Sequence, residues 1–162
     1  MLGLSQVCNA TEDCGPASIG LDQSSSQIES YFFTGTCHFR NEDYALAVEN
    51  WEQLSQLRPA TVADEELKID VLNNLGYMKF YGFGTEQQQD DAVTLWQEAI
   101  ALGHDEAEYH LCHAYADCQQ STYNKSSARM HCRKAYLVYN GQEQPNKKIL
   151  AKIEFYLEQL GL

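Results

Sequence analysis

Apolar residues recur every three or four positions along most of this chain, which is the spacing of amphipathic helices. The pattern begins near Gln27 and predicts a first helix from there. A second helix is expected over residues 44–57, and Pro59 follows it as a stop signal. Further helical segments follow, and the last is expected over residues 145–161. The chain is therefore expected to be a series of helices separated by short turns.

The pattern also repeats itself at a longer interval of 36 residues. Small and apolar residues at Leu75, Gly76, Ala92, Trp96 and Ala99 recur as Leu111, Cys112, Ala128, Cys132 and Ala135. A fixed period of this length is typical of stacked helix pairs. We therefore predict an all-α fold of about three antiparallel helix pairs, at residues 27–60, 64–103 and 104–140. Such stacks need a terminal helix with a polar outer face, and residues 145–161 are expected to supply this cap.

The first 26 residues lack the helical pattern. Gly15, Pro16 and Gly20 interrupt them, and three consecutive serines at 24–26 end them. We therefore expect residues 1–26 to be an irregular segment and residues 27–162 to form a single domain. A chain of 162 residues is long enough for one domain with a substantial core.

The first pair carries small and aromatic residues in a fixed order. They are Tyr31, Gly35, Ala47, Trp51, Leu54 and Pro59. In this order and register the pair resembles a tetratricopeptide repeat. One departure is Thr34, which stands where that family has a leucine.

The second pair has a longer connection between its helices, and its motifs are more specific. In order they are Leu75-Gly76, Tyr81-Gly82-Phe83-Gly84, Asp90-Asp91-Ala92, Trp96, and Ala99 followed by Gly103. This order resembles the Sel-one-like repeat, a close relative of the tetratricopeptide repeat. The resemblance implies a right-handed α-solenoid and a non-enzymatic adaptor that binds a peptide or a partner protein. It also suggests a bacterial protein of the envelope or a secreted one.

In such arrays the first helix of each pair lines a concave groove. The residues that the resemblance places in this groove are Phe32, Thr36, Phe39, Asn73, Tyr77, Phe80, Tyr109 and His113. Aromatic side chains in a groove suit a peptide or a helix of a partner. The alternative is that some of these rings only pack between repeats.

The charge of the chain narrows the choice of partner. The net charge is −12, and the phosphate backbone of a nucleic acid would be repelled by it. The charge is uneven, since residues 1–118 carry 20 acidic and 4 basic residues whereas residues 119–162 carry 3 acidic and 7 basic ones. This is either an ordinary solvated surface or a sign that the two parts face different partners, or each other in a head-to-tail contact.

Six cysteines are many for a chain of this size, and an even number is consistent with disulfides. Cys112 and Cys132 should face each other across the third helix pair, where a bridge would stabilise a repeat that has lost its glycine. A bridge between Cys8 and Cys14 would close a small loop in the N-terminal segment. Cys37 and Cys118 have no obvious partners. Disulfides favour a periplasmic or secreted protein over a cytoplasmic one.

A second hypothesis assigns these thiols a function of their own. Cysteines and histidines crowd the third repeat, at His110, Cys112, His113, Cys118, His131 and Cys132. The chain would then be a redox-sensing or metal-binding repeat protein. No Cys-x-x-Cys pair supports zinc, however, and we expect neither a metal nor another cofactor on the adaptor hypothesis.

Several other functions find no support in the sequence. No hydrolase, metalloprotease or phosphate-binding motif occurs, so we do not expect an enzyme. No apolar run is long enough to span a membrane. No signal peptide is visible, which is compatible with a cytosolic protein or with a chain whose signal peptide has been removed.

Overall fold

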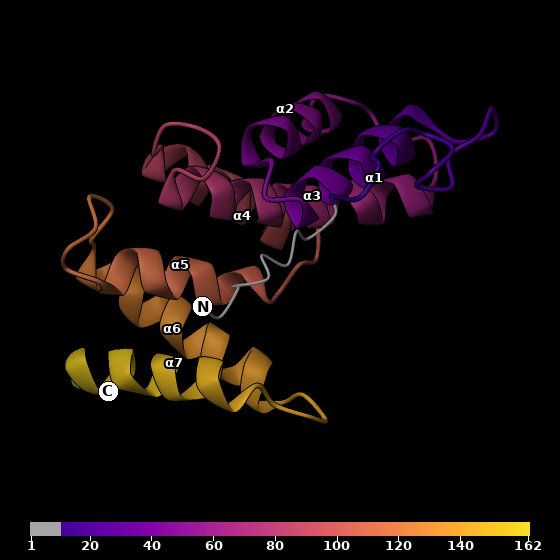
Figure 1. Ribbon diagram of the computed structural model, residues 1–162. Helices are drawn as coiled ribbons and strands as arrows, with labels where there is room; N and C mark the ends of the chain where they lie inside the picture. The colour runs from indigo at the N-terminus through magenta and orange to yellow at the C-terminus, as the bar shows by residue number, and fades with distance from the viewer. Residues whose placement is uncertain (1–10) are drawn as a thin grey trace, which may run out of the picture.

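The computed structural model describes residues 11–162, and within this range it contains seven helices and no strand (Figure 1). This confirms the predicted all-α class. The helices are α1 (Gln27–Arg40), α2 (Tyr44–Ser55), α3 (Val62–Tyr81), α4 (Gln89–Ala101), α5 (Ala107–Ala116), α6 (Lys125–Asn140) and α7 (Lys147–Gln159).

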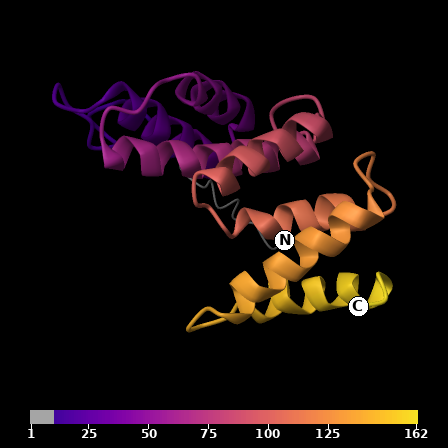
Figure 2. The ribbon, with the colours of Figure 1, turned by 180° about the vertical axis from the view of Figure 1, so that it is seen from behind.

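Consecutive helices pack mainly as three pairs, α1 with α2, α3 with α4 and α5 with α6. Helices α2 and α3 join the first pair to the second, and α4 and α5 join the second pair to the third. The last helix, α7, packs against α5 and α6. The two opposite views show these elements following one another from α1 and α2 at one end to α7 at the other (Figures 1 and 2).

Polar side chains at the helix starts explain where the helices begin. Ser26 and Glu29 form a reciprocal capping box at α1, so that two free backbone N–H groups gain acceptors. Thr61 caps α3, and Asn146 caps α7. At α6 the cap is Asn124, whose side chain accepts hydrogen bonds from the backbone N–H groups of Ser126 and Ser127.

A contact between a glycine and a tryptophan recurs in the first two pairs. A Cβ atom on Gly35 would lie 2.6 Å from Nε1 of Trp51, and one on Gly76 would lie 2.5 Å from Nε1 of Trp96. Any larger residue would therefore push the indole away. Glycine lets the two helices of each pair approach closely, and both tryptophans are buried in the resulting core.

The third pair replaces this contact with a disulfide. Cys112 and Cys132 occupy the positions of Gly76 and Trp96, one 36-residue period later. They are bridged, with their Cα atoms 4.5 Å apart, and both are fully buried. The bridge that the pattern predicts between α5 and α6 is therefore present.

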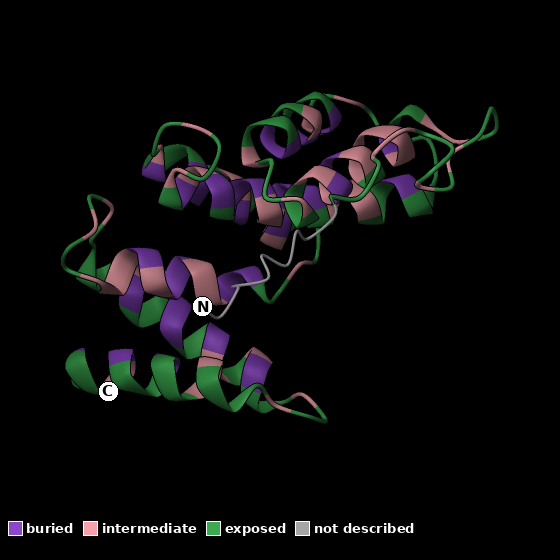
Figure 3. Ribbon diagram, in the orientation of Figure 1, coloured by how far each residue is buried: buried purple, intermediate pink, exposed green. Residues whose placement is uncertain are grey.

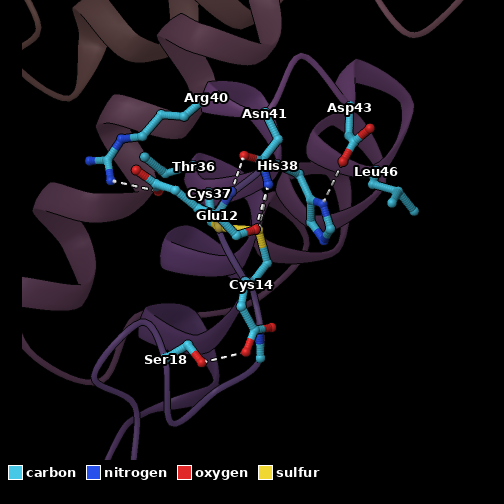
Figure 4. Close-up of a disulfide and its surroundings, with 12 residues drawn as sticks. Glu12, Cys14, Ser18, Thr36, Cys37, His38, Arg40, Asn41, Asp43 and Leu46 are labelled. Carbon is cyan, nitrogen blue, oxygen red and sulfur yellow. Dashed lines mark hydrogen bonds and ion pairs between the residues drawn. A yellow bond between two sulfur atoms is a disulfide. The ribbon is translucent and has the colours of Figure 1, made fainter. Parts of the chain in front are cut away.

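The second disulfide differs from the one expected in the N-terminal segment. Cys14 is bridged to Cys37 of α1, with Cα atoms 5.7 Å apart, so the expected Cys8–Cys14 bridge is wrong (Figure 4). Two hydrogen bonds of 2.8 Å between the Glu12 backbone and the Asn41 side chain hold the segment against the end of α1. They bring Cys14 to Cys37. Cys8 lies outside the described residues.

The buried residues lie where helices meet, and the outer faces are exposed (Figure 3). Among residues 11–162, no helix combines the length and the apolar character needed to cross a membrane. Two intramolecular disulfides indicate an oxidising environment, because such bridges are rare in reducing compartments.

Candidate functional site

A cavity of about 350 Å³ lies between α1 and α3. Its walls are mainly apolar and aromatic, with a few polar groups, which is the composition of a binding pocket. The residues that line it are Phe32, Thr36, Phe39, Arg40, Trp51, Asn74, Tyr77 and Met78. We refer to this cavity as the α1–α3 pocket.

Helical spacing explains why these side chains converge. Phe32, Thr36 and Phe39 are four and three residues apart on α1, so they lie on one face. Asn74 and Tyr77 are three residues apart on the facing side of α3. Trp51 reaches the pocket from α2, where its ring packs against that of Phe39 with a centroid distance of 5.7 Å. The pocket therefore depends on three helices being packed together.

Exposed aromatic rings continue from the mouth of the pocket. Phe39 and Tyr77 are 39% and 38% exposed, and the neighbouring Tyr81 and Phe83 are 41% and 40% exposed. The ring of Tyr77 lies 4.8 Å from that of Tyr81 and 6.0 Å from that of Phe83. These four rings form a contiguous apolar surface, here called the aromatic patch, of a kind that marks interaction sites.

The turn after α3 is fixed against α2. Gly84 has a φ of +71°, and a Cβ atom there would come within 2.3 Å of the Tyr44 backbone. Only glycine fits this position. The ring of Phe83 consequently packs on Tyr44, at 5.7 Å, and remains beside Tyr77. A rigid turn thus holds part of the aromatic patch.

Four of the eight residues predicted for the groove line the α1–α3 pocket. They are Phe32, Thr36, Phe39 and Tyr77. The pocket also includes residues that the prediction left out: Arg40, Trp51, Asn74 and Met78. Trp51 and Met78 belong to the buried core, and the packing of α1 on α3 makes them part of the cavity wall as well.

The other four predicted residues do not line the pocket. Phe80 is fully buried against Trp96, at a centroid distance of 5.3 Å, so its predicted place in the groove is wrong. It lies on the face of α3 that α4 and α5 cover. The Asn73 carbonyl accepts a hydrogen bond from Trp96 Nε1, and its side-chain oxygen is buried without a partner. Tyr109 packs into the core of the third pair.

The side chain of His113 makes its contacts inside the fold and does not face the pocket. Its Nδ1 atom lies 2.5 Å from the hydroxyl of Tyr156 on α7, and its ring packs against Phe80 and Tyr81. Burial lowers the pKa of His113 and raises that of Tyr81 to about 12, so both are neutral at pH 7. Tyr81 therefore contributes an uncharged ring to the aromatic patch at pH 7.

His110 should make stability depend on pH. It stacks on Trp96 at 4.9 Å, and burial, with His104 and His113 nearby, lowers its pKa from 6.5 to about 4. The unfolded chain therefore takes up this proton at a higher pH than the folded chain. The stability that the folded chain gains from a neutral His110 is complete above pH 6.5 and is lost as the pH falls to 4. This loss lowers the free energy of unfolding by at most about 3 kcal/mol.

The variant His110→Phe should retain the stacking and lose this pH dependence. Urea unfolding at intervals between pH 7 and pH 4 measures how the free energy of unfolding depends on pH. The free energy of unfolding of the variant should fall less steeply than that of the unchanged protein. Parallel curves for the two proteins would contradict the assignment.

Most of the residues that could have bound a metal are engaged in other bonds. Cys112 and Cys132 are bridged, and His131 lies 2.5 Å from the buried Glu108, which Lys134 also contacts at 3.1 Å. Burial raises the pKa of Glu108, but the hydrogen bonds from His131 and Lys134 outweigh it and the pKa is lowered overall. Over residues 11–162, no group of three or more metal-binding side chains comes together.

Comparison with known proteins identifies no relative. No family model matches the chain, and neither a curated protein nor a solved structure matches it.

Proposed function

We propose that this chain is a non-enzymatic adaptor that binds a peptide segment or a partner protein through the α1–α3 pocket and the aromatic patch. The observation that carries the proposal is an apolar pocket with exposed aromatic rings at its mouth. Aromatic side chains are the usual energetic centres of protein interfaces. On this proposal the three helix pairs are a short right-handed α-solenoid of the tetratricopeptide or Sel-one-like kind.

The internal repetition supports the solenoid part of the proposal. A close contact between the two helices recurs in three successive pairs, as glycine against tryptophan at Gly35–Trp51 and Gly76–Trp96 and as a disulfide at Cys112–Cys132. Each pair leaves an apolar face that its neighbour covers, as in stacked repeats. In such a stack the first helices, α1, α3 and α5, provide the binding surface.

The disulfides support an extracytoplasmic location, either periplasmic or secreted. With the Sel-one-like resemblance, they favour an adaptor of a bacterial envelope or of secretion. The net charge of −12 disfavours nucleic acid as the partner.

Replacement of Tyr77 should weaken partner binding without unfolding the protein. A partner is first captured by crosslinking in extracellular or envelope extract, and its affinity is then measured by calorimetry. Tyr77→Ala should weaken binding tenfold or more, whereas Tyr77→Phe retains the ring and should bind normally.

Tyr123 offers a matched control, because it is also an exposed tyrosine, at 46%, but does not line the α1–α3 pocket. Tyr123→Ala should change the affinity less than twofold. Equal affinities for the Tyr77→Ala and Tyr123→Ala variants would refute the proposed surface. Circular dichroism of each variant establishes that the fold is retained.

A further inference from the structure

The second helices of the three pairs carry charges of opposite sign. Helices α2 and α4 contain acidic residues and neither lysine nor arginine, whereas α6 contains lysine and arginine and no acidic residue. The acidic residues are Glu49, Glu52, Asp90, Asp91 and Glu98, and the basic ones are Lys125, Arg129, Arg133 and Lys134. All of them are exposed. The folded chain therefore presents an acidic and a basic helix face to its surroundings.

The 36-residue period shows that packing does not require this reversal of charge. Helices α4 and α6 occupy equivalent places in the second and third pairs, and the buried alanines of α4 recur as buried alanines in α6. The exposed positions differ, since Gln97 and Glu98 of α4 correspond to Arg133 and Lys134 of α6. The core positions are thus kept while the sign of the outer face changes.

Most of these charges on α4 and α6 are not neutralised within the chain. Over residues 11–162, the side chains on these two helices that make no ion pair include Asp90, Asp91, Glu98, Lys125 and Arg133. Lys134 differs, because it contacts the buried Glu108 at 3.1 Å. The unpaired charges of α4 are therefore complementary to those of α6.

The basic face of α6 also carries two large apolar side chains. Met130 is 50% exposed and Leu137 is 72% exposed. They are seven residues apart, so they lie on one face of the helix, beside Arg133. Helix α6 packs mainly against α5 and α7, which leaves this face outward. Apolar side chains framed by charged ones have the composition of an interface centre with its polar rim.

We propose that two copies of this chain associate, with the basic face of α6 in each copy packed on the acidic face of α4 in the other. A two-fold axis allows both contacts to form at once, so the dimer closes and neither charged face is left open. The chain itself supplies the acidic complement of α6. A nucleic acid or an anionic membrane would instead be repelled by the net charge of −12.

The association is independent of the proposed function. The α1–α3 pocket takes its lining from α1, α2 and α3 and none from α4 or α6, so it stays open in the dimer. Exposed ion pairs are individually weak, and we expect a chain that is monomeric at about 1 μM and dimeric above about 100 μM. Sedimentation velocity of the full chain at low salt over this range measures the association.

Two charge-reversed variants test which faces meet. Asp91→Lys with Glu98→Lys makes both faces basic, and Lys125→Glu with Arg133→Glu makes both acidic. Each variant alone should bind itself at least tenfold more weakly than the unchanged chain binds itself. An equimolar mixture of the two should form a dimer again, because each face then meets one of opposite sign.

The variant with two new lysines separates this contact from a general effect of charge. Each replacement of an acid by lysine adds two charges, so the net charge changes from −12 to −8. Weaker overall repulsion would strengthen association, whereas the proposed contact requires it to weaken. The matched control is Glu65→Lys with Glu66→Lys on α3, which makes the same change of net charge at two other exposed acids and should leave the dimer intact.

Four results would overturn the proposal. The unchanged chain could remain a monomer at about 100 μM, the variant with lysines on α4 could associate as well as its control, or the mixture could fail to form a dimer. Cys118 is exposed and free, so a covalent dimer on nonreducing electrophoresis would be the fourth. A monomeric chain that binds phosphatidylglycerol vesicles through Lys125 and Arg133 would place a membrane on this face instead. Circular dichroism of each variant establishes that the fold is retained.

Discussion

Replacement of Trp96 by alanine is expected to cost about 3–5 kcal/mol of the free energy of unfolding. Trp96 is fully buried and joins two helix pairs. Within its own pair it lies over Gly76, and its Nε1 atom donates to the Asn73 carbonyl. Towards the third pair it stacks on His110 at 4.9 Å. Because the surrounding structure relaxes only in part after such a truncation, a cavity is left and adds to the cost.

Urea unfolding monitored by circular dichroism measures this cost. Leu137→Ala is the control, because Leu137 on α6 is 72% exposed and its truncation should change the free energy of unfolding by less than about 0.5 kcal/mol. A Trp96→Ala variant that loses less than about 1 kcal/mol would show that Trp96 does not hold the second and third pairs together.

Removal of the Cys112–Cys132 bridge should have the second-largest effect, about 3 kcal/mol. The bridge joins residues 20 apart in sequence and occupies the place of the glycine–tryptophan contact in the other pairs. Without it the third pair has two small side chains where the second has an indole. The double variant Cys112→Ala, Cys132→Ala avoids burying a hydroxyl in this apolar site.

The other disulfide provides the comparison. The bridge from Cys14 to Cys37 attaches the N-terminal segment to α1 and does not join two helices. Cys14→Ala with Cys37→Ala should therefore lower the melting temperature less than the Cys112, Cys132 double variant does. Thermal unfolding followed by circular dichroism measures both. The reverse order would contradict the structural role given to the third pair's bridge.

Local patterns in the sequence account for most of the helical architecture. Helical spacing and capping residues such as Asn124 act over a few positions and can be read directly. The Cys112–Cys132 bridge was predictable for the same reason, since the 36-residue period aligns both residues with a contact pair. The Cys14–Cys37 bridge was not, because it depends on where an irregular segment lies in space.

The candidate site was predictable only in part. The resemblance to the repeat family placed Phe32, Thr36, Phe39 and Tyr77 in the groove, and all four line the pocket. Phe80 shares the helix with Tyr77, but neighbouring helices cover its face, and a helical pattern does not show how far such a cover extends. Trp51 belongs to the pocket wall because α1, α2 and α3 pack together, and the pattern of one helix does not show this packing.

Hydrogen exchange of the chain with and without a captured partner tests the central claim most directly. Binding at the α1–α3 pocket predicts slower exchange in the second half of α1 and the second half of α3, with α6 unchanged. Slower exchange confined to α6 and α7 would contradict the claim and place the binding surface at the basic end of the chain.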